Sequence, residues 1–106
     1  MTTFDQREHA FEQKFAQDEE VRFKVHAARN HMLGLWAAGK LGLSGAAAEA
    51  YATNLTQSDV ARFQDDQLVR KIMDDFKAKN VPASEAEVRR ELERVLVAAK
   101  RRIGGH

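Results

Sequence analysis

Apolar residues recur at helical spacing along nearly the whole chain, and this periodicity constrains the fold more than any other feature. No window alternates apolar and polar residues with a period of two, as a half-buried β-strand would. Proline occurs once in 106 residues, between two periodic segments. This length suits one small domain. The sequence therefore predicts an all-α protein, built as a four-helix bundle with short loops.

Glycine, proline and capping residues divide the periodic segments into four predicted helices. Their expected ranges are residues 3–39, 45–61, 66–79 and 84–104. The break between the second and third helices is placed near residues 64–66, because two adjacent carboxylates favour the first turn of a helix. Asn80 and Pro82 are expected to end the third helix. Ser84 and Glu87 form a capping-box pattern, in which each side chain satisfies a free backbone N–H of the other.

Each predicted helix has an apolar face that is expected to line the core. In the first helix this face comprises Val21, Val25, Ala28, Met32, Leu35 and Trp36. In the second it comprises Ala47, Tyr51 and Leu55, with Ala48 and Ala52 beside them. In the third and fourth it comprises Leu68, Val69, Ile72, Met73 and Phe76, and then Val88, Leu92, Val95, Leu96, Ala99 and Ile103.

The N-terminal segment, residues 3–23, carries a second apolar stripe. Phe4, Phe11 and Phe15 share one narrow face of a helix, and the other faces are charged or amide. Val21 follows Phe15 by six residues, which places the expected core face about 120° around the helix from the phenylalanines. We therefore divide the chain into an arm, residues 1–18, and a bundle domain, residues 19–106. The alternative is that these first turns pack on a neighbouring helix of the same bundle.

A helical arm of this kind is typical of helix-in-groove recognition, in which a few aromatic side chains dominate the binding free energy. Alone in water, about 15 residues with little to pack against are expected to be frayed or disordered. The predicted fold class is thus a four-helix bundle with a mobile N-terminal helical arm.

Charge and composition exclude several classes of function. The formal net charge is +1, and the charges of both signs are interleaved, so the chain lacks the footprint of a nucleic-acid-binding protein. The short basic run at residues 100–102 is expected to complement the end of a helix dipole. There is no cysteine, and no apolar run is long enough to span a bilayer or serve as a signal peptide. We expect no direct membrane insertion.

No catalytic or metal-binding constellation can be assembled from the sequence. His26 and His31 are five residues apart, so they do not share a helical face, and His-Glu-x-x-His is absent. The glycines near Lys40 do not match a phosphate-binding loop. We therefore predict no catalytic residues, no metal and no enzyme activity. His9 lies in the arm, and we hypothesise that its protonation makes a partner contact pH-dependent.

A set of motifs extends over nearly the whole chain and is densest over residues 3–52. The motifs are Thr3-Phe4-Asp5, Arg7-Glu8, Ala10-Phe11-Glu12, Lys14-Phe15-Ala16, Asp18, Phe23-Lys24, Ala28-Arg29-Asn30, Leu33-Gly34, Trp36-Ala37-Ala38, Gly42-Leu43, Gly45, Tyr51-Ala52, Asp65-Asp66 and Arg70-Lys71-Ile72. Together they closely resemble the zeta subunit family, the inhibitors of the rotary F-type ATP synthase in alphaproteobacteria.

The resemblance implies a function and a site. The arm would enter an interface between catalytic and non-catalytic subunits, next to the central rotor, and block rotation in the hydrolytic direction. Phe4, Phe11 and Phe15 would be the apolar anchors, and Arg7, Glu8 and Lys14 the polar contacts at the rim. The protein would act in the cytoplasm, at the cytoplasmic face of the inner membrane. It would be a monomer when free and would need no cofactor.

Two other functions are compatible with the residues. One is a bundle that senses an adenine nucleotide weakly through Arg and Lys side chains. The other is a helical adaptor that presents its phenylalanine arm to an unrelated partner.

Overall fold

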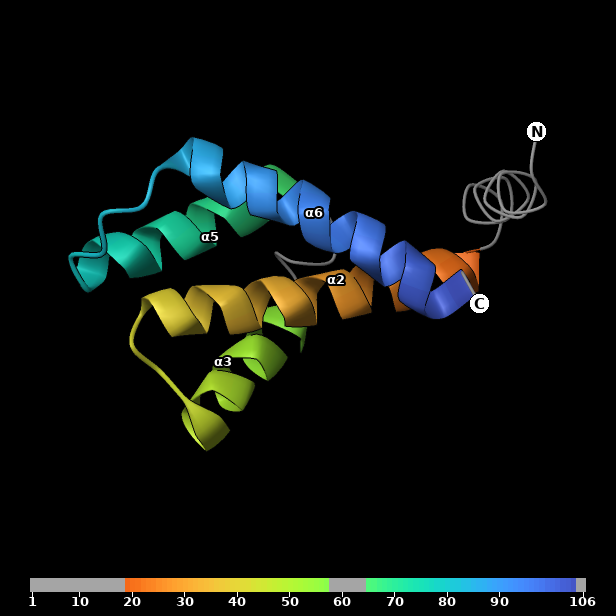
Figure 1. Ribbon diagram of the computed structural model, residues 1–106, viewed down its shortest axis with the longest axis horizontal. Coiled ribbons are helices and arrows are strands. Elements are labelled where there is room, and N and C mark those ends of the chain that lie inside the picture. The colour runs from red at the N-terminus through yellow and green to blue at the C-terminus, as the bar shows by residue number, and fades with distance from the viewer. Residues whose placement is uncertain (1–18, 58–64, 105–106) are drawn as a thin grey trace.

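In the computed structural model of the chain, the structure describes residues 19–57 and 65–104. This part of the chain contains four α-helices and no strand, which confirms the predicted all-α class. The helices are α2 (Glu19–Lys40), α3 (Gly45–Gln57), α5 (Asp65–Ala78) and α6 (Glu85–Gly104) (Figure 1).

The longest helix, α2, lies at the centre of the arrangement. It packs against α3 and also against α6, while α5 packs on α6. Helices α2 and α6 run in opposite directions, so α2 begins and α6 ends at the same end of the molecule (Figure 1). No helix of the described ranges is long and apolar enough to cross a membrane.

Helices α2 and α3 approach each other closely because small residues meet at their crossing. A Cβ atom placed on Gly34 would lie 2.7 Å from the Ala52 Cα, which is closer than real Cβ contacts come. Gly34 and Ala52 are both buried. The alanine-rich composition of α3 thus allows its backbone to lie almost directly on that of α2.

The core is apolar and draws on all four helices. Its buried members are Leu33, Ala37, Leu55, Leu68, Val69, Ile72, Phe76, Val88, Leu92 and Val95. Trp36 packs against it with its ring edge-to-face on Phe76, the ring centroids being 6.0 Å apart. The predicted core faces of the third and fourth helices are confirmed, since Leu68, Val69, Ile72 and Phe76 are buried in α5, and Val88, Leu92, Val95 and Ala99 in α6.

The predicted face of the first helix is wrong in part. Of its six residues only Val25 is fully buried, and the other five are partly exposed. The structure instead buries Arg29, Asn30, Leu33, Gly34, Ala37 and Ala38. The reason is that α2 has neighbours on two sides, so its buried surface is wider than one stripe. In the second helix Ala47 is exposed, whereas Ala52 and Leu55 are buried.

Local signals placed the helix ends well. Asn80 has φ 57° and the Val81 N–H donates to the Phe76 carbonyl at 2.8 Å, which is the C-terminal cap expected after α5. The Glu87 N–H donates to Ser84 Oγ at 3.1 Å, so half of the capping box is present. The other half is replaced, because the Glu87 carboxylate accepts a hydrogen bond from Lys40.

Two predicted boundaries differ slightly from the described helices, and a third falls on residues that the structure does not describe. Helix α2 ends at Lys40, one residue later than expected, and α5 begins at Asp65, within the predicted break. The predicted end of the second helix, at residue 61, lies outside the described residues.

Candidate functional site

All six predicted partner contacts precede the first described residue. They are Phe4, Arg7, Glu8, Phe11, Lys14 and Phe15. The proposed arm, residues 1–18, and the hypothesis about His9 likewise lie outside the described residues. The structure does describe the start of α2, which follows the predicted arm in the sequence, and the surroundings of that helix end.

The predicted arm, residues 1–18, immediately precedes α2 in the sequence. Glu19 and Glu20 form the first described turn, where carboxylates complement the positive end of the helix dipole. The start of α2 and the end of α6 lie at the same end of the molecule (Figure 1).

The structure corrects the angular argument for separating the arm from the bundle. Arg29 follows Phe11 by 18 residues and Leu33 follows Phe15 by 18 residues, which is about five complete turns of an ideal helix. Both Arg29 and Leu33 are buried. On one continuous ideal helix the phenylalanines would therefore share the buried face of α2, and the expected offset of about 120° is wrong. The division at residue 18 stays a prediction.

Arg29 is a buried charge that the sequence analysis missed. Its side chain is 3% exposed, yet its guanidinium is well bonded. Nη1 donates to Asp65 Oδ1 at 2.9 Å, and Nε donates to Asn30 Oδ1 at 3.0 Å. These bonds tie the start of α5 to the middle of α2. The missed signal was position, since Arg29 lies one turn from both Val25 and Leu33 on the buried face.

His26 lies one turn after Arg22 on α2, in surroundings that disfavour its charged form. Partial burial lowers the pKa of His26, and the positive charges of Arg29, Arg22 and Lys100 lower it further. The carboxylate of Asp65 opposes this shift. Burial and three nearby cations thus outweigh the Asp65 carboxylate at His26.

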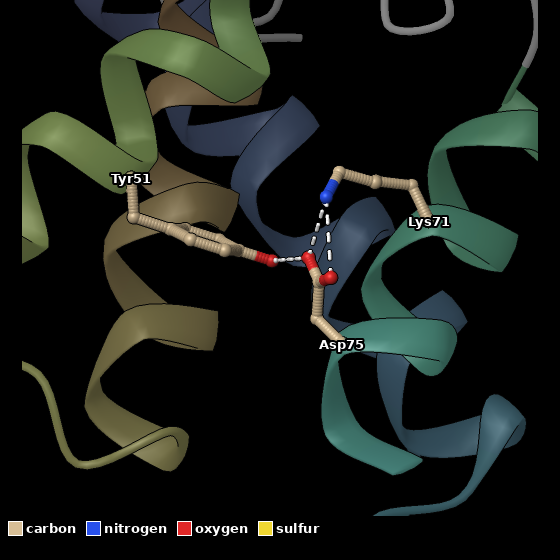
Figure 2. Close-up of polar contacts among 3 residues, drawn as sticks. All are labelled: Tyr51, Lys71 and Asp75. Atoms are coloured by element: carbon tan, nitrogen blue, oxygen red, sulfur yellow. Dashed lines mark hydrogen bonds and ion pairs between the residues drawn. The ribbon is translucent and has the colours of Figure 1, made fainter. Parts of the chain in front are cut away.

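A polar cluster links α3 to α5 (Figure 2). The Tyr51 hydroxyl donates to Asp75 Oδ2 at 2.7 Å, and Lys71 Nζ donates to both oxygens of the same carboxylate at 3.1 and 2.9 Å. Burial of the ring, together with the bond to Asp75, raises the pKa of the Tyr51 phenol above its ordinary value. The geometry is that of a tether between two helices, because every polar atom in it has a partner.

The other histidine in the described part of the chain, His31, lies 2.9 Å from Glu49 through its Nε2 atom and so bridges α2 and α3. Within residues 19–57 and 65–104, no three His, Cys, Asp or Glu side chains are grouped so that they could hold a metal ion.

The chain matches the family model described as ATPase inhibitor subunit zeta over residues 1–102. The match spans the predicted arm and all but the last residues of α6, and it confirms the resemblance found in the sequence motifs. A search among curated proteins found no match.

Proposed function

This chain belongs to the ATPase inhibitor subunit zeta family, and from this premise we propose that it inhibits ATP hydrolysis by the F-type ATP synthase through its N-terminal arm. Family membership makes the protein a regulatory subunit that binds an ATPase. The observation that carries the proposal is the extent of the match, because residues 1–102 include the whole arm as well as the bundle.

In this proposal the arm binds as an amphipathic helix in a groove between a catalytic and a non-catalytic subunit, beside the central rotor. Phe4, Phe11 and Phe15 are the anchors, since burying one phenylalanine contributes about 1.5–3 kcal/mol before ordering costs. Arg7 and Lys14 make polar contacts at the rim of the groove, as does Glu8. Three anchors are enough to offset the entropy of ordering a short arm.

The bundle is a bulky domain attached to the arm, and it is too large to enter the groove that binds the arm. The arm directly precedes α2 in the sequence, and α2 is the helix that packs against both α3 and α6. A force on the arm is therefore resisted by the most extensively packed helix in the described structure. An inserted arm with this bulk at its end obstructs rotation sterically.

The block is expected to act mainly on hydrolysis. ATP synthesis turns the rotor in the other direction, which favours release of the arm and not its insertion. The protein accordingly works in the cytoplasm, where the catalytic head projects from the inner membrane.

The test compares two substitutions that each place a carboxylate on an apolar position. In Phe11→Asp the change falls in the predicted arm, and in Ala47→Asp it falls on α3, where Ala47 is exposed. With the cognate catalytic head, Phe11→Asp should lose most of the inhibition of ATP hydrolysis, whereas Ala47→Asp should keep it. Both variants should unfold at nearly the wild-type temperature, because the proposal places Phe11 in the arm and Ala47 is exposed.

Retention of full inhibition by Phe11→Asp would refute the arm mechanism. A large drop in its unfolding temperature would show instead that Phe11 belongs to the core of the bundle.

A further inference from the structure

Positive charge is concentrated at the end of the bundle where α2 begins and α6 ends. The described residues contain fourteen Lys and Arg against eleven Asp and Glu, an excess of three. Five of those cations lie in residues 19–24 and 100–103, and the carboxylates in these two ranges are Glu19 and Glu20. This end of the bundle therefore accounts for the whole excess of three positive charges. The remaining described residues carry nine charges of each sign.

An exposed aromatic side chain lies within this positive region. Phe23 is 61% exposed, the highest value among the large hydrophobic residues that the structure describes. We define the arm-end surface as Phe23 with the exposed cations Arg22, Lys24, Arg101 and Arg102. Lys24 pairs with Glu20 at 3.5 Å, but no carboxylate of the described ranges pairs with Arg22, Arg101 or Arg102.

Folding accounts for only part of this arrangement. Arg101 and Arg102 lie in the last turn of α6, where cations complement the helix dipole. Arg22 and Lys24 lie in the first turns of α2, where the dipole favours anions. A large exposed phenylalanine adds nothing to the core. The arm-end surface therefore carries features that helix stability does not require.

We infer that the arm-end surface is a second docking surface, which binds an acidic surface of the ATP synthase next to the groove that takes the arm. This inference rests on the proposed function. Guanidinium groups suit the occupant because they bind carboxylates in bidentate geometry, and exposed aromatic side chains are common anchors at protein interfaces. A balanced charge over the rest of the bundle argues for one local acidic partner patch and against nucleic acid or an anionic membrane.

Proximity to the arm supports this occupant. Phe23 lies four residues after Glu19, a distance of about 6 Å along the helix axis. A partner that holds the arm consequently brings its own surface against Phe23 and its neighbours. The arm supplies the block, and the arm-end surface adds affinity and sets the orientation of the bundle.

The test uses full-length protein with two arginines neutralised, Arg101→Gln/Arg102→Gln. The matched control is Lys77→Gln/Lys79→Gln, which removes two exposed cations from the C-terminal end of α5 at the opposite end of the molecule (Figure 1). At low ionic strength the arginine variant should need about two- to ten-fold more protein for half-maximal inhibition of ATP hydrolysis. The control should stay within about two-fold of wild type, and the difference should shrink as salt is raised.

A second pair of variants tests the apolar part of the surface. Phe23→Ser should also raise the half-maximal concentration, while Val97→Ser, at the other exposed large hydrophobic residue of the described ranges, should not. Inhibition at saturation should be complete for every variant, because the arm is intact.

Equal behaviour of the arginine variant and its control would overturn the docking surface, as would a salt-independent difference between them. The docking surface would also be overturned if the wild-type protein bound anionic lipid vesicles and the arginine variant lost that binding with no change in its inhibition of ATP hydrolysis. Failure of the wild-type protein to inhibit would refute the proposed function itself.

Discussion

The contact between α2 and α3 depends on the missing side chain of Gly34, and replacing it with alanine tests the packing directly. The added Cβ would lie 2.7 Å from Ala52 Cα and 3.0 Å from Ala52 Cβ. Carbon atoms in contact prefer about 3.5–4.0 Å, so the two helices would have to separate by nearly an ångström. The nearest obstacle is backbone, which cannot rotate away as a flexible side chain can.

Two effects of the Gly34→Ala change oppose each other. Overpacking at a tight site costs about 1–3 kcal/mol. Alanine is also a better helix former than glycine, by about 0.8–1.0 kcal/mol. The same substitution at Gly39 supplies the second effect without the first, because Gly39 lies in α2 with nothing within 4 Å of the new Cβ. The stability difference between the two variants therefore isolates the packing term.

We expect Gly34→Ala to be less stable than Gly39→Ala by about 1–3 kcal/mol in urea unfolding followed by circular dichroism. For a domain of this size each kcal/mol corresponds to about 4–8 °C in Tm, so thermal unfolding should separate them as well. Gly39→Ala should equal or exceed the wild-type stability. If Gly34→Ala were as stable as Gly39→Ala, the close approach of α2 and α3 would be wrong.

Three further outcomes follow from the polar contacts. Asp65→Asn should destabilise the fold by about 1–2 kcal/mol, because it leaves the buried Arg29 guanidinium without a carboxylate. Asp66→Asn should cost less, because its partner Arg89 is exposed. Chemical denaturation of the two variants compares these free energies of unfolding. Tyr51 is the chain's one tyrosine, and its pKa is raised in the folded protein. Ultraviolet absorbance should therefore show tyrosinate forming at higher pH in the folded than in the unfolded protein. The free energy of unfolding should fall as pH rises above about 10, because the unfolded state then ionises first. Because the pKa of His26 is lowered in the folded protein, the stability that it contributes above about pH 6.5 is lost as pH falls. A His26→Gln variant should therefore lose less stability than the wild type between pH 7 and about 5. Identical pH series of unfolding curves for the variant and the wild type would contradict this.

The sequence predicted best where a helix has one packed side. The apolar face of α5 was placed correctly, because Leu68, Ile72 and Phe76 recur at simple helical spacing toward one core. The cap at Asn80 was also placed correctly, since capping depends on a few adjacent residues.

Prediction was less successful for α2, which has neighbours on two sides. Periodicity favoured one stripe, whereas the structure also buries Gly34 against α3 and Arg29 beside α5. The partner of Arg29 is 36 residues away, so no local pattern could indicate the pair. Small and charged residues on the buried face carry little hydrophobic signal, so the sequence placed the core face of α2 at the wrong angle around the helix. The expected offset of about 120° between that face and the phenylalanine stripe was wrong for the same reason. The six arm residues of the candidate site lie outside the described residues, and their roles stay predictions.

We propose that the arm, and not the bundle, inhibits ATP hydrolysis. The most direct measurement compares full-length protein with a chain that begins at Glu19, using the cognate catalytic head and equal protein concentrations. Circular dichroism would first establish that the shortened chain unfolds cooperatively at nearly the same temperature. We predict that only the full-length protein inhibits hydrolysis. Equal inhibition by both chains, or none by either, would contradict the account.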